Sequence, residues 1–180
     1  MKNWKRKKGL MRAPKFTTVL EPMEREVLGN LTAAVSEAIM ARAQSAPRDE
    51  LSELTGIPSG HKDAPEDPAM ARLLPDFERE GDEEYEGDNS LLRSLHENDI
   101  CRAKLANLQV IAEVVGPDGG VELTLSEEQA WAFIAGLNDL RLYLSATPGG
   151  IDEAVDADRE MLVEWLGFNQ DSLLTALKGE

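Results

Sequence analysis

The chain has 180 residues, of which 42% are hydrophobic and 29% are charged, and its formal net charge is −15 at pH 7. This length and composition suit a single packed domain, and no run of about 18 apolar residues is present that could cross a membrane. The only cysteine, Cys101, excludes a disulfide within the chain. Because no apolar segment follows the basic N-terminus as it would in a secretion signal, we expect a cytoplasmic protein.

The charge is distributed unevenly along the chain. Residues 1–15 carry seven basic and no acidic side chains, a charge of +7, whereas the rest carries 12 basic against 34 acidic side chains, a charge of −22. We interpret residues 1–15 as a basic arm and 16–180 as one helical domain. The arm is either a solubilising tail, a contact for phosphate or an acidic partner, or a segment that folds back on the acidic body. Its basic residues are Lys2, Lys5, Arg6, Lys7, Lys8, Arg12 and Lys15.

The first elements after the arm are a strand and a helix. The sequence "KFTTVLEP" predicts a short strand, with Phe16, Thr18 and Leu20 on one face and Thr17 and Val19 on the other. A helix is expected over 22–45, because Pro22 suits a first helical position and apolar residues then recur at helical spacing. The sequence that follows, "PRDELSELTGI", predicts a short helix that ends at Gly56, since glycine is a frequent stop residue.

The middle of the chain combines one short helix with an acidic stretch. The sequence "EDPAMARLLPDF" predicts a helix that Asp67 caps, that begins at Pro68 and that Pro75 terminates. The residues near 79–89 are rich in acids and show no apolar period, so we expect a flexible loop there.

Two apolar stripes that are out of phase follow between residues 89 and 115. One consists of Leu91, Leu92 and Leu95, and the other of Cys101, Leu105, Leu108, Ala112 and Val115. A single straight helix cannot bury both stripes. We therefore expect separate helices at about 89–96 and 98–115, with a break around His96–Asn98.

The C-terminal third predicts a second strand and two more helices. Residues 121–125 alternate like the first strand, and the two strands should pair as a ribbon, because a lone strand leaves its backbone groups unpaired. Ser126 then caps a helix that runs to about 146, and a last helix is expected over 157–178. We count Trp131 and Met161 among the buried residues of these helices. The predicted fold is mainly α, a single-domain bundle of about five to seven helices with a two-stranded ribbon.

The segment "SLHENDICRA" contains residue types that are common in metal and redox sites. His96 and Cys101 are five positions apart, roughly 140° around a helix, whereas zinc ligands on helices are three or four apart. We therefore expect neither a metal nor a cofactor, and interpret His96 as a cap or junction residue. A site that combines His61 and His96, the only histidines, with acidic ligands stays open geometrically.

Cys101 opens an apolar stripe, which is typical of a buried, inert thiol. The nearby Arg102 and Lys104 could lower a thiol pKa, but they lie on other faces of the helix. Likewise, Arg141 lies beside an apolar helix face and needs a carboxylate, for which Asp76 and Glu97 are candidates. We favour an ion-pair tie between helices over a catalytic pair. The candidate junction residues are His96, Glu97, Asn138, Arg141, Arg93 and Asp76.

Four segments carry a family resemblance in their order and spacing. They are "RAPKFTTVLEPMEREVLGNL", "DELSELTGIPSGHKDAPEDPAMARLLPDF", "LLRSLHENDI" and "VELTLSEEQAWAFIAGLNDLRLYL". Together they resemble the actinobacterial family catalogued as domain of unknown function 2017, over nearly the whole chain. The resemblance implies a small, intracellular, mostly helical protein with no assigned catalysis.

The resemblance also suggests partners. A mycobacterial member is described as an oxidative-stress transcription regulator that works with a sigma factor, through a Cys-x-x-x-Cys pair near its N-terminus. The corresponding "MKNWKRKKGLM" contains no cysteine. Relatives are often encoded beside a proteolytic adaptor, which suggests a second kind of partner.

We therefore predict a non-enzymatic regulatory protein that acts through protein contacts in a transcriptional or oxidative-stress response, with a sigma factor or a proteolytic adaptor as partner. One alternative is a DNA-contacting regulator that uses the basic arm, although the net charge disfavours nucleic acid. Another is a metal-dependent enzyme. A homodimer is expected if the last helix exposes its apolar face.

Overall fold

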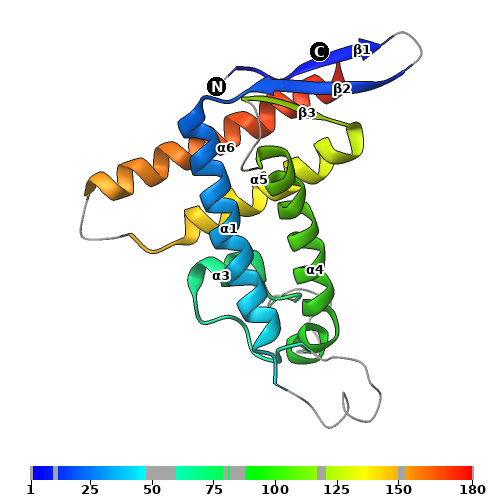
Figure 1. Ribbon diagram of the computed structural model, residues 1–180. Helices are drawn as coiled ribbons and strands as arrows, with labels where there is room; N and C mark the ends of the chain where they lie inside the picture. The colour runs from blue at the N-terminus through cyan, green and yellow to red at the C-terminus, as the bar shows by residue number, and fades with distance from the viewer. Residues whose placement is uncertain are drawn as a thin grey trace.

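The computed structural model describes residues 2–9, 12–47, 60–78, 81, 88–116, 121–149 and 153–179. In these residues five helices accompany one antiparallel sheet, so the predicted mainly α class is confirmed. In Figure 1 the sheet lies at one end of the molecule beside α6, and α1 and α4 extend away from it. The elements are β1 (Lys5–Gly9), β2 (Arg12–Val19), α1 (Pro22–Gln44), α3 (Pro68–Leu73), α4 (Asn89–Val115), β3 (Glu122–Leu125), α5 (Glu127–Ala146) and α6 (Glu153–Lys178).

The sheet has three strands where the sequence predicted two. The expected pair is present: β2 runs antiparallel to β3, with Phe16 opposite Leu125. The additional strand is β1, which pairs with β2 so that Arg6 lies opposite Phe16. The order β1-β2-β3 makes β1 an edge strand. Most of the segment expected to be an arm is therefore paired in the sheet.

Trp4 explains why so basic a segment joins the sheet. It immediately precedes β1, is only 5% exposed, and packs edge-on against Phe133 of α5 with a centroid distance of 5.5 Å. Its backbone N–H donates to Ser172 Oγ of α6 at 2.9 Å. The five residues of β1 carry no apolar side chain, so alternation could not reveal this strand.

The predicted break at His96–Asn98 is wrong, because α4 is one continuous helix. Leu91 and Leu95 are 55% and 60% exposed, so the first apolar stripe faces outward. The buried face of α4 instead carries polar residues in its first half and apolar residues in its second. These are Arg93, Ser94, Glu97, Cys101, Leu108, Ile111 and Val115. The prediction failed because it assumed that only apolar side chains mark a buried face, whereas the first half of this face buries the ion-paired side chains of Arg93 and Glu97.

The helix starts agree well with the sequence patterns. The Asp67 carboxylate accepts a hydrogen bond from the Met70 N–H at 3.0 Å and caps α3. Ser126 and Gln129 form the expected capping box of α5. By contrast, α6 begins at Glu153, four residues before the predicted start. The short helix predicted to end at Gly56, and most of the acidic loop near 79–89, lie outside the described residues.

Two predicted core residues are exposed instead: Trp131 by 54% and Met161 by 62%. The apolar core of α5 is built by the residues around them in the helix, namely Ala130, Phe133, Ile134, Leu137 and Leu140. None of the helices in the described part of the chain combines the length and apolarity needed to cross a bilayer.

Close packing of α4 against α5 depends on Gly136. A Cβ atom at this position would lie 2.7 Å from Ile111 Cδ1 and 3.3 Å from the Asn107 carbonyl oxygen. Gly29 on α1 has more room, since a Cβ there would meet Val115 Cγ1 at 3.6 Å, an ordinary contact distance.

We expect Gly136→Ala to lower the free energy of unfolding by about 1–3 kcal/mol, because an added methyl group overpacks a filled interface. Gly29→Ala should instead raise it by up to about 1 kcal/mol, because alanine restricts the unfolded chain and favours a helix. Urea denaturation of both variants measures the difference. Equal effects of the same sign would contradict the close approach at Gly136.

Candidate functional site

A buried ion-pair cluster occupies the polar half of the α4 face. Arg93 is 1% exposed and Glu97 is 2% exposed, and Arg93 Nη1 lies 2.9 Å from Glu97 Oε2. Arg93 Nη2 donates to Asp76 Oδ1 at 2.7 Å, and Arg42 Nε of α1 donates to Glu97 Oε1 at 2.8 Å. Two guanidinium groups thus meet two carboxylates. The cluster is neutral overall and ties α1 and α4 to the segment that follows α3.

The carbonyl oxygens of Leu74 and Pro75 accept further hydrogen bonds from Arg93, at 3.1 and 3.3 Å. Burying a charged side chain is costly unless it is paired and hydrogen-bonded. Arg93 meets this requirement with both carboxylates and backbone acceptors. This arrangement holds elements together and leaves its charged groups engaged with one another rather than directed at a substrate.

The two carboxylates considered for Arg141, Asp76 and Glu97, pair with Arg93 instead. Arg141 Nη2 donates to Asn138 Oδ1 at 3.3 Å on α5, and its guanidinium group lies near Gly167 of α6. Asn138 and Arg141 are therefore neighbours that lie apart from the cluster.

Sequence reasoning did not include Arg42 in the cluster. A signal was present, because Arg42 follows the buried residues Val35 and Ile39 by seven and three positions and so continues the buried stripe of α1. A charged residue that continues an apolar stripe indicates a buried ion pair.

The two histidines have different neighbours. His61 Nε2 lies 2.9 Å from the Arg42 carbonyl oxygen and 3.1 Å from Ser45 Oγ. His96 caps no helix: it lies inside α4 on an exposed face, with its ring centroid 6.0 Å from that of Phe77. Within the described ranges, no group of three or more His, Cys, Asp or Glu side chains could hold a metal ion.

Cys101 lies one turn beyond the ion-pair cluster and is 1% exposed. Burial raises the pKa of its thiol to about 11, and the negative charge of Glu97 adds to this effect. The thiol is therefore protonated at neutral pH, and the thiolate is the reactive form.

We expect Cys101 in the native protein to react with a thiol reagent such as DTNB at pH 8 far more slowly than in urea-unfolded protein. Unfolding restores both access and a pKa near 9.0. The same shift makes folding stability fall as pH rises from about 9 to about 11, because only the unfolded chain ionises the thiol freely in that window. Complete labelling of the native protein on mixing would contradict the buried assignment.

The basic residues of the N-terminal segment lie mainly on the sheet. The side chains of Lys2, Lys5, Arg6, Lys7, Lys8 and Lys15 are all exposed. Lys7 Nζ pairs with Glu122 Oε1 of β3 at 3.1 Å, on a part of the sheet where both side chains are mostly exposed. Arg12 begins β2, and its side chain lies outside the described set.

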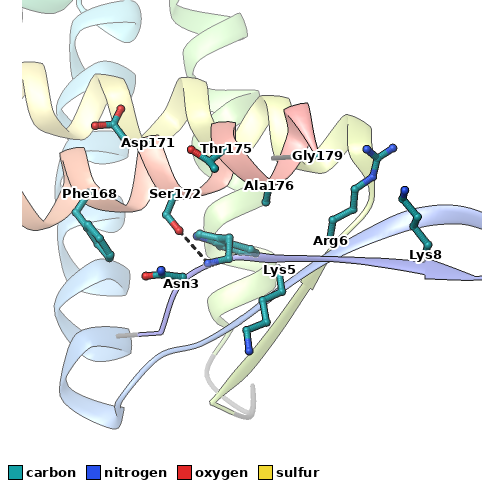
Figure 2. Close-up of a pocket in the computed structure, with 11 residues that line it drawn as sticks. Asn3, Lys5, Arg6, Lys8, Phe168, Asp171, Ser172, Thr175, Ala176 and Gly179 are labelled. Atoms are coloured by element: carbon teal, nitrogen blue, oxygen red, sulfur yellow. Dashed lines mark hydrogen bonds between the residues drawn. The ribbon is translucent and has the colours of Figure 1, made fainter.

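A groove of about 640 Å³ runs between β1 and the C-terminal half of α6. In Figure 2 the side chains of Arg6 and Lys8 extend to the same side of β1 as α6, whereas Lys5 extends to the opposite side. The charged and polar residues that line the groove include Lys5, Arg6, Lys8, Asp171, Ser172 and Thr175.

Comparison with known proteins shows to which family the chain belongs. The model of a family described as Domain of unknown function (DUF2017) matches residues 1–177. The chain belongs to the DUF2017 family. The matched range includes the basic strand β1, the ion-pair cluster and nearly all of α6, so both candidate regions are part of the DUF2017 domain.

Curated relatives of this DUF2017 chain carry a functional name. Proteins named "Oxidative stress regulator AosR" from Mycobacterium bovis and Mycobacterium tuberculosis are 37% identical to it over 197 aligned residues, which cover 99% of this chain and 89% of each relative. A "Putative oxidative stress regulator AosR" from Mycobacterium leprae is 34% identical, over 98% of this chain and 88% of its own length. No solved structure gives a significant match.

Proposed function

We propose that this protein is a non-enzymatic regulator in the oxidative-stress response and that it acts by binding another protein. The observation that carries the proposal is the 37% identity to proteins named as oxidative stress regulators, over 99% of this chain. The similarity covers the whole fold rather than one element, so we assign the regulatory role to the complete domain.

The distribution of charge supports a protein partner. An acidic protein with a compact basic surface on one edge strand attracts acidic partners there, while its overall field opposes the approach of nucleic acid. A sigma factor and a proteolytic adaptor are the two partner classes that we propose, in the cytoplasm.

An oxidant cannot act on this protein by forming a disulfide within the chain, because Cys101 is its only cysteine. Its burial also separates the thiol from dissolved oxidants. We infer that oxidative conditions act on the partner, or on the amount of this protein, rather than on a thiol switch in this chain.

Affinity capture from the cells that make the protein, with and without peroxide, tests the proposal. We expect a specific protein to be enriched by mass spectrometry under both conditions, since the contact does not depend on Cys101. Capture by Cys101→Ala serves as the control and should be unchanged. Recovery of nucleic acid alone, with no enriched protein, would contradict the proposal.

A DNA-contacting regulator is the second candidate, favoured by the exposed basic side chains on β1 and β2. Deletion of residues 1–15 is not a clean test, because it also removes Trp4 from the core and β1 from the sheet. Lys5→Gln with Lys15→Gln removes charge without removing the strand. DNA affinity that falls with salt and falls again in this double variant would favour the second candidate over the first.

A further inference from the structure

We propose that the groove between β1 and α6 binds an acidic segment of a protein partner in an extended conformation, which adds a fourth strand at the free edge of β1. This inference rests on the proposed function, since it names the surface and the chemistry of the protein contact. The occupant is defined by two properties, negative charge and an unpaired extended backbone.

The backbone of β1 provides the first half of the argument. As the first strand in the order β1-β2-β3, it presents one row of N–H and C=O groups away from β2. Just before the strand, the Trp4 N–H points to α6 and is satisfied by Ser172 Oγ at 2.9 Å. At Trp4 this edge therefore already donates a hydrogen bond to an acceptor that lies outside the sheet. An added strand supplies such acceptors and donors along its whole length.

The shape of the groove matches an extended peptide. Its β1 side runs from Asn3 to Lys8, which spans about 17 Å at the rise of a strand. Its α6 side runs from Phe168 to Gly179, also about 17 Å at the rise of a helix. The two walls have equal length and, in Figure 2, run alongside one another. A groove with these proportions accepts about five extended residues.

The charge of the groove selects an acidic occupant. Two basic side chains, Arg6 and Lys8, extend to the α6 side of β1 and line the groove, against one acidic side chain, Asp171 (Figure 2). Among the described residues Arg6 and Lys8 form no ion pair, whereas Lys7 on the same strand is paired with Glu122. Arg6 and Lys8 can form charge-assisted bonds with carboxylates of the incoming strand.

Alternative occupants fit less well. A second copy of this chain would bring its own basic β1 to the edge, and like charges on neighbouring strands repel. A DNA duplex is much larger than the groove wall of β1 and would also approach the acidic body of the protein, whose charge repels phosphate groups. An acidic extended segment of about five residues meets no like charge on β1 and, because it is short, lies along the basic strand rather than across the acidic body.

Fluorescence anisotropy with synthetic peptides tests the proposal on the full chain. The probe is a labelled octapeptide of alternating Glu and Thr, compared with a Lys/Thr peptide and with a Glu/Thr peptide that carries two prolines. We expect binding by the Glu/Thr peptide only, because lysine reverses the charge and proline removes strand donors. The double variant Arg6→Ala/Lys8→Ala should weaken that binding at least tenfold.

The matched control is Lys2→Ala/Lys15→Ala, which removes the same charge from exposed residues that do not line the groove. It should leave binding within about twofold. Equal weakening by both double variants would show that the peptide binds through general charge attraction, which would overturn the groove as its binding site. Equal binding of the proline peptide would overturn strand addition, and absence of Glu/Thr binding at low salt would overturn the whole inference.

Repeating the cellular capture with Arg6→Ala/Lys8→Ala separates this inference from the proposed function. Loss of the partner, with retention by Lys2→Ala/Lys15→Ala, supports the groove. Retention of the partner by both variants overturns the groove and leaves the proposed function intact. Failure of the unmodified protein to capture any protein overturns both.

Discussion

Replacing Arg93 with methionine is expected to lower the free energy of unfolding by about 3–5 kcal/mol, the cost of breaking a buried ion pair by removing one partner. Methionine retains much of the apolar stem of arginine, so the loss of stability measures the effect of removing the charged group. Glu97 would keep Arg42 as its partner but would lose the 2.9 Å contact to Arg93. Urea denaturation followed by circular dichroism measures the change.

Arg102→Met is the matched control on the same helix. Arg102 pairs with Asp99 at 2.7 Å, but the two side chains are 77% and 71% exposed. Exposed pairs contribute about 0–1 kcal/mol, so this variant should be nearly as stable as the unmodified protein. Similar losses in the two variants would show that the Arg93 cluster is not a buried stabilising element.

Trp4→Ala should cost about 3–5 kcal/mol, the range for truncating a buried aromatic side chain. Trp4 is the apolar anchor of β1, so we also expect the variant to release that strand and to lose any ligand of the groove. Hydrogen exchange of the β1 and β2 amides, together with urea denaturation, checks both effects. A stable variant with protected β1 amides would contradict the anchoring role.

Two further variants, Trp131→Ala and Trp4→Phe, serve as comparisons for Trp4→Ala. Trp131 is 54% exposed, so Trp131→Ala should cost far less than Trp4→Ala. Trp4 Nε1 is buried, and in the described part of the structure it has no hydrogen-bond partner. Trp4→Phe keeps an aromatic ring and removes this unpaired donor, so it should be better tolerated than Trp4→Ala.

Local patterns were sufficient for the elements that carry their own signals. The stripe of α1, the Asp67 cap of α3 and the Ser126–Gln129 capping box of α5 involve residues three or four positions apart. Interactions at that range form within a helix whatever surrounds it. The pairing of β2 with β3 was also predictable, because a lone strand must satisfy its backbone.

Long-range contacts explain where prediction failed. The edge strand β1 exists because Trp4 reaches Phe133, which lies 129 positions away in the sequence. The continuity of α4 depends on Arg42 and Asp76, which lie on other segments and satisfy Glu97 and Arg93. The hydrophobic pattern of α4 alone indicated a break, since a pattern does not reveal which charges will be neutralised.

The sequence by itself determined the mainly α class, most helix starts, the charge asymmetry and the absence of an intrachain disulfide, because these follow from composition and from neighbours in the chain. Only the tertiary structure decided that the basic segment is an edge strand beside α6, and that Glu97 and Arg93 form a buried neutral cluster. The physical reason is that the burial of charge and the pairing of a strand depend on partners that folding brings together from distant positions.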